Sequence, residues 1–126
     1  MNNTVRIVLA VVAGAAIWFA LVAASDWAIR TQWLEYAAVF KAMTFTTQMM
    51  IARLAESTVA LVIASWATAK IAPASRLAPW ALALLMLAVF APYHLLVLWA
   101  KFPPWYHATF LISLLVLPPL TARLAR

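Results

Sequence analysis

Long apolar runs, separated by short polar or proline-rich stretches, are the dominant pattern of this chain. An α-helix rises about 1.5 Å per residue, so about 20 consecutive apolar residues cross the ~30 Å hydrocarbon core of a bilayer. The runs cover approximately residues 5–24, 44–69, 77–100 and 105–117, the last being the shortest. The pattern therefore predicts four transmembrane helices.

The first run admits a second interpretation, because Arg6 precedes it and small residues end it near Ser25. A signal peptide has these features. The apolar region here is longer than the ~7–15 residues usual for such a peptide, which favours a retained transmembrane helix.

Prolines mark the breaks between the later runs. Pro73 lies between the second and third runs, and Pro103-Pro104 separates the third from the fourth. Proline lacks a backbone N–H and restricts the residue that precedes it. By the same argument Pro92 is expected to kink the third helix.

Pro118-Pro119 is expected to end the fourth helix and to leave residues 121–126 as a polar tail. Short connections place neighbouring helices antiparallel. The predicted fold is therefore all-α: a single membrane domain, residues 1–126, folded as a bundle of four antiparallel transmembrane helices.

Residues 25–43 interrupt the apolar pattern. They mix charged side chains with two tryptophans and a tyrosine, and their apolar positions recur at three- and four-residue steps. Aromatic residues of this kind favour the membrane interface. A short helix at the membrane surface and a helical extension of the next span are both compatible with this pattern.

The composition excludes a soluble domain. Of the 126 residues, 68% are hydrophobic and only 10% are charged, whereas soluble chains are typically about 25% charged. The net charge of +6 does not indicate nucleic-acid binding, because the basic residues occur singly and form no stripe that could follow a phosphate backbone. The chain has no cysteine, so thiol chemistry and thiolate metal sites are excluded.

Basic residues near the helix ends predict the orientation. One side of the predicted bundle carries five of them: Arg6, Lys70, Arg76, Arg123 and Arg126. The other side carries three: Arg30, Lys41 and Lys101. The positive-inside rule therefore places both termini in the cytoplasm. The alanine- and tryptophan-rich composition and the short loops favour a bacterial inner membrane.

The second run is the only one with charges inside it. Arg53 and Glu56 are one helical turn apart, so they share a face and can partly neutralise each other. Plotted at helical spacing, they share that face with Ser57 and with small residues such as Ala60. Because a charge at the centre of a membrane helix costs about 2.5–3.5 kcal/mol, this stripe is expected to face protein or an internal cavity.

Two interpretations of the stripe remain open. In the first, it is a polar clamp that docks against another helix, in this chain or in a partner. In the second, Glu56 is a proton or cation site, and Arg53 balances its charge or binds an anionic substrate.

A second polar group is expected on the outer side of the bundle, formed by Asp26, Glu35, His94 and His107. A metal site there is geometrically possible, but no ligand-spacing motif supports one. A haem held by both histidines is disfavoured because their predicted depths differ by about 6 Å. Asp26, Glu35 and Arg30 are better explained as a solvated loop than as a catalytic set.

No nucleotide-binding, hydrolase, zinc-protease or haem-attachment motif is present, and no cofactor is expected. The simplest hypothesis is a small accessory or assembly subunit that docks on a larger membrane protein, or on a second copy of itself, through the Arg53/Glu56 stripe. The alternative is a small oligomeric transporter or channel with Glu56 as its ion site. A membrane-embedded lipid-modifying enzyme that uses the outer loop and both histidines is a weaker alternative.

Overall fold

A computed structural model describes residues 1–126, and all of its regular structure is helical. The elements, in chain order, are α1 (Asn3–Gln32), α2 (Leu34–Val39), α3 (Thr47–Ile71), α4 (Leu77–Pro92), a π-helical turn η1 (Tyr93–Val97), a 3₁₀ turn η2 (Trp99–Lys101) and α5 (Pro104–Ala125). Four helices, with α4 and η1 counted as one, are long and apolar enough to cross a membrane. The predicted helical class and the number of such helices are confirmed.

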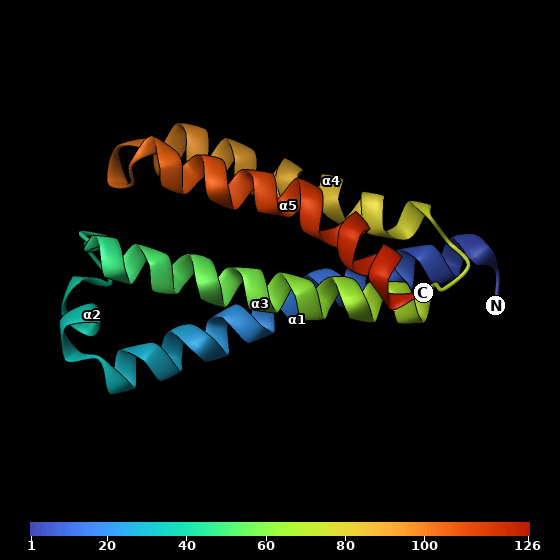
Figure 1. The fold of residues 1–126 in the computed structure, drawn as a ribbon, viewed down its shortest axis with the longest axis horizontal. Helices are drawn as coiled ribbons and strands as arrows, with labels where there is room; N and C mark the ends of the chain where they lie inside the picture. The colour runs from blue at the N-terminus through green and yellow to red at the C-terminus, as the bar shows by residue number, and fades with distance from the viewer.

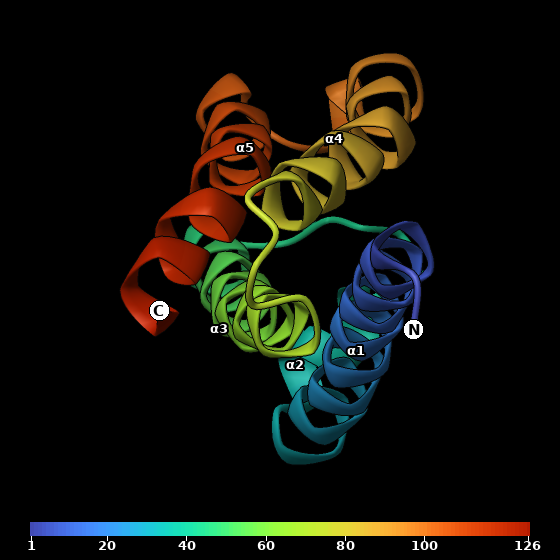
Figure 2. The same ribbon diagram turned by 90° about the vertical axis from the view of Figure 1, so that its right-hand side faces the viewer.

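The four long helices form a ring. α3 packs against α1 on one side and α5 on the other, and α4 closes the ring against α5 and α1 (Figure 2). Both termini and the turn between α3 and α4 lie at one end of the bundle, whereas α2 lies at the opposite end (Figure 1). We call these the terminal end and the α2 end.

The first helix is longer than the sequence pattern predicts, because it continues to Gln32 instead of ending at Ala24. The polar residues that indicated a loop are accommodated within the helix. The Ser25 hydroxyl donates to the Leu21 carbonyl at 2.7 Å, and Arg30 Nε donates to the Asp26 carbonyl at 3.3 Å. Of the predicted interfacial segment 25–43, only the short α2 remains a separate helix.

The fourth helix is also longer than expected, since α5 passes through Pro118-Pro119 and ends at Ala125. Leu114 and Ala122 are buried, so packing on both sides of the prolines favours continuation. Lys70 of α3 stabilises the extension, because its Nζ donates to the Ala125 carbonyl at 3.0 Å. The expected polar tail is therefore the last turn of α5.

Pro92 is the last residue of α4 and is followed at once by η1. A proline cannot continue the hydrogen-bond ladder, and a π turn is one way in which a helix adjusts to such a defect.

The core in the centre of the bundle is small and closely packed. Eight buried residues form it, namely Trp18, Ala60, Leu61, Ala64, Leu82, Met86, Phe110 and Leu114. Many large apolar side chains remain exposed on the outside, as expected of a surface that faces lipid.

Gly14 sets the distance between α1 and α3. A Cβ atom at this position would lie 2.2 Å from Thr68 Oγ1 and 3.3 Å from the Ala64 carbonyl oxygen. The Thr68 hydroxyl contacts the Ala10 carbonyl oxygen of α1 at 3.2 Å, and a side chain at Gly14 would push it away. The two helices can approach this closely only because residue 14 lacks a side chain.

We predict that Gly14→Leu destabilises the protein by about 1–3 kcal/mol, because overpacking forces α1 and α3 apart. The measurement is the midpoint of thermal unfolding in detergent. Ala16→Leu, at an exposed position on the same helix, is the control and should leave the midpoint unchanged. Equal midpoints for the two variants would contradict the assigned helix contact.

Candidate functional site

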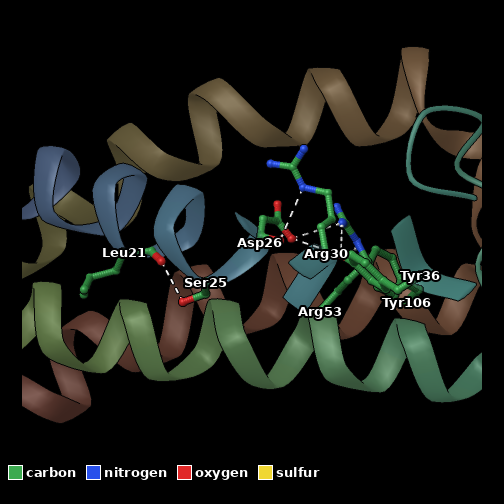
Figure 3. Close-up of polar contacts among 7 residues, drawn as sticks. All are labelled: Leu21, Ser25, Asp26, Arg30, Tyr36, Arg53 and Tyr106. Carbon is green, nitrogen blue, oxygen red and sulfur yellow. Dashed lines mark hydrogen bonds and ion pairs between the residues drawn. The ribbon is translucent and has the colours of Figure 1, made fainter. Parts of the chain in front are cut away.

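Arg53 lies at the centre of a polar cluster near the α2 end of the bundle (Figure 3). Its Nη1 atom donates to the Tyr36 hydroxyl at 2.8 Å, and its Nε atom donates to the Tyr106 hydroxyl at 3.2 Å. Nη1 also lies 3.7 Å from Oδ1 of Asp26, which forms an ion pair with it. One guanidinium therefore connects α1, α2, α3 and α5.

Tyr36 connects the cation to its counter-ion. Its side chain is fully buried, and its hydroxyl donates to Asp26 Oδ1 at 2.9 Å while it accepts from Arg53. Burial raises the pKa of Tyr36 above its usual range, although the nearby Arg53 opposes this effect. The phenol therefore keeps the proton that it donates to Asp26.

Aromatic rings cover the rest of the guanidinium. The Arg53 carbon Cζ lies 4.6 Å from the ring centre of Phe45 and 5.9 Å from that of Phe102. A cation over an aromatic face is stabilised by the ring quadrupole, more strongly where water is excluded. Two hydroxyls, a carboxylate and two rings thus surround Arg53, which also lines the cavity beside Glu56.

Glu56 has fewer polar partners within the chain than Arg53. The expected pairing of Arg53 with Glu56 is not what the structure contains, since Arg53 forms its ion pair with Asp26. Asp26 can reach Arg53 because α1 continues past Ala24 and carries the carboxylate inward. Glu56 lies close enough to Asp26 for the two carboxyls to interact, but its Oε2 atom is buried and has no hydrogen-bond partner in the chain.

Glu56 borders an internal cavity of about 160 Å³. The cavity lies among α1, α3, the π turn after α4, and α5, and aromatic side chains form most of its wall. Three buried polar atoms in this chain lack a hydrogen-bond partner, and all three belong to residues that line this cavity: Trp18 Nε1, Glu56 Oε2 and Ser57 Oγ. Buried polar groups are normally satisfied, so this cavity is suited to water or a polar ligand.

His94 lines the same cavity and contacts His107. The two Nδ1 atoms are 2.8 Å apart, and His107 Nε2 lies 3.2 Å from the Trp99 carbonyl oxygen. A carbonyl can only accept, so a neutral His107 carries its proton on Nε2 and accepts at Nδ1. His94 then donates from Nδ1, and its Nε2 is left as a free acceptor on a side chain that lines the cavity.

The predicted outer-side group of four does not assemble as a unit. His94 and His107 meet, Asp26 joins the Arg53 cluster, and Glu35 is exposed on α2. The side chains of the two histidines meet although an offset of about 6 Å was expected, and the π turn begins just before His94. Because the two histidine rings are hydrogen-bonded to each other, there is no space between them for a haem. No three metal-binding side chains converge in the structure.

Sequence reasoning identified Arg53, Glu56 and Ser57 but missed Asp26, Tyr36 and Tyr106 as the partners of Arg53. A charge inside a membrane helix requires a partner, and Asp26 and Glu35 were the available carboxyls besides Glu56. The expected end of the first helix at Ala24 placed Asp26 in a loop and concealed this pairing.

Neither a family model, a curated protein nor a solved structure matches this chain. The chemistry of the site therefore rests on its own geometry.

We predict that Tyr36→Phe destabilises the protein by about 1–3 kcal/mol, because both Arg53 and Asp26 lose a buried hydrogen-bond partner. Thermal or denaturant unfolding in detergent measures the effect. Tyr93→Phe is the matched control, since the Tyr93 hydroxyl forms no hydrogen bond in the chain and its side chain is partly exposed. A change of the same size in both variants would show that the cluster does not depend on Tyr36.

Proposed function

We propose that this protein is a small transporter or channel of the bacterial inner membrane and that Glu56 binds the transported proton or small cation. Its four long helices would span the bilayer in alternating directions, with the terminal end in the cytoplasm. The single observation that carries the proposal is the cavity in which Trp18, Glu56 and Ser57 all present unpartnered polar atoms.

The contrast between the two charged residues of α3 supports an ion site. A purely structural clamp would satisfy both side chains, since an unpaired buried polar group costs free energy. Arg53 has its partners within the chain, whereas Glu56 keeps a carboxyl oxygen available beside the cavity. We therefore assign a structural role to Arg53 and ligand binding to Glu56.

The charge of the cluster favours a monovalent cation. Asp26 and Glu56 contribute two carboxyls, and Arg53 contributes one positive charge. One bound proton or monovalent cation would make the three groups neutral together, which a low-dielectric environment strongly favours.

Glu56 also lines a second space. Besides the internal cavity, it lines a groove of about 310 Å³ between α1 and α3. Val59 and Ile63 form part of the groove and are substantially exposed on the outside of the bundle. An ion at Glu56 would thus border both the interior and the outer surface of the bundle.

We predict that Glu56→Gln lowers proton or cation flux in proteoliposomes at least about tenfold, because the carboxyl that binds the ion has become neutral. A pH-sensitive dye inside the vesicles, or uptake of a labelled monovalent cation, measures the flux. Glu35→Gln is the matched control, since Glu35 is an exposed carboxyl on α2 and should leave the flux unchanged.

Thermal unfolding of both variants checks that the fold is intact. The absence of flux in wild-type vesicles of verified orientation, or undiminished flux in Glu56→Gln, would overturn the transport proposal.

A second candidate function, an accessory subunit of a larger membrane complex or of a homo-oligomer, is supported by the same groove. Ala55 and Ala60 line it beside Glu56 and Ser25. Small residues that flank a polar group allow close approach and hydrogen bonding by another helix within a membrane. A helix of the partner would then cover Glu56 from outside.

For this candidate we predict that native mass spectrometry of the protein, extracted from its own membrane in a mild detergent, detects a stoichiometric complex. Ala55→Leu fills the groove and should dissociate the complex, while Ala16→Leu on the exposed face of α1 should preserve it. A lone monomer in the wild type would exclude the subunit role and leave the transport proposal to the flux assay.

A further inference from the structure

A second and larger cavity, of about 790 Å³, lies at the terminal end of the bundle. It is formed between the first turns of α4 and the second half of α5. The Arg53 cluster lies near the opposite end of the bundle. Its charged side chains are three arginines, Arg76, Arg123 and Arg126, and no aspartate or glutamate lines it. This cavity shares no lining residue with the cavity beside Glu56.

The prolines of α5 help to open this space. Pro119 lies in the cavity wall, and Pro118-Pro119 removes two backbone donors from the middle of the helix. The last turns of α5 diverge from the start of α4 and lean toward α3 (Figure 2). Lys70 of α3 holds them there through its contact with the Ala125 carbonyl.

The arginines are arranged to bind an anion. Arg126 donates to the Ser75 carbonyl in the turn before α4, which ties it to the edge of the cavity. Arg76 and Arg123 form no hydrogen bond or ion pair within the chain, and both are exposed. Guanidinium groups bind phosphate with paired N–H donors, so three of them around one space are suited to a phosphate group.

The rest of the wall is apolar and exposed. Trp80, Leu115 and Leu120 line it, and each is close to half-exposed. Tryptophan is enriched at the level of the lipid headgroups, where an aromatic body meets the acyl chains. A free phosphate ion would leave these surfaces uncovered, whereas a hydrocarbon chain would cover them.

We propose that this cavity binds one anionic phospholipid. Its phosphate would be held by Arg76, Arg123 and Arg126, and an acyl chain would lie along Trp80, Leu115 and Leu120. Its place at the end of the helices is the depth at which headgroups lie in a bilayer. A zwitterionic lipid of the same chain length would bind more weakly, because its positive headgroup would face three arginines.

The test is native mass spectrometry of the full chain in detergent, titrated with phosphatidylglycerol and with phosphatidylcholine of identical acyl chains. The wild type should retain phosphatidylglycerol preferentially. Arg123→Gln should weaken that retention roughly fivefold, and Arg76→Gln combined with Arg123→Gln roughly 25-fold, as expected for about fivefold per basic residue at a membrane surface. Arg6→Gln removes one charge from the same end but lies outside the cavity, so it should change retention less than about twofold.

A second measurement does not require the arginine variants to fold. Phosphatidylglycerol with brominated acyl chains should quench the tryptophan fluorescence of the wild type more than that of Trp80→Phe, and the difference reports on Trp80 because the other six tryptophans are common to both proteins. Equal retention of the two lipids, equal losses in Arg6→Gln and Arg123→Gln, or no quenching of Trp80 would each overturn the proposal. Displacement of the lipid by glycerol phosphate alone would show that the cavity recognises a free phosphate compound instead.

Discussion

The burial of one positive charge determines the arrangement of the α2 end of this protein. Arg53 cannot remain unpaired among apolar side chains, because a buried charge without a partner is costly. Its requirements account for several features that otherwise look unrelated. α1 continues to Gln32 and so carries Asp26 inward, α2 folds back and brings Tyr36, and α5 begins early enough to supply Tyr106. Phe45, in the loop before α3, covers the remaining face of the guanidinium.

The same requirements explain why two charged residues one turn apart have different roles. Asp26 and the tyrosines neutralise Arg53, so Glu56 is not needed as its counter-ion. A carboxyl that the packing does not use, placed beside a cavity with Ser57 and His94, is available to a ligand. His94, hydrogen-bonded to His107, lines the same cavity. Stability and chemistry are thus divided between neighbouring positions of α3.

The sequence predicted the helical class, the four long apolar helices and the inward-facing stripe of α3, because these depend on hydropathy and helical periodicity alone. It did not predict the features that depend on tertiary partners. The polar pattern places Asp26 in a loop, and only the position of Arg53 opposite it explains why the helix continues. Pro118-Pro119 predicts a helix end, and only the contacts of Lys70 and the buried Ala122 explain the following turn. No periodicity in the sequence predicts the π turn after Pro92 or the contact between His94 and His107.

The position of Glu56 between the internal cavity and the groove of α1 and α3 has a mechanical consequence. A side chain that lines two pockets can turn from one to the other by rotating about its own bonds, and such rotations are much faster than collective helix movements. The carboxyl of Glu56 can therefore change its surroundings while the four helices stay fixed around Arg53.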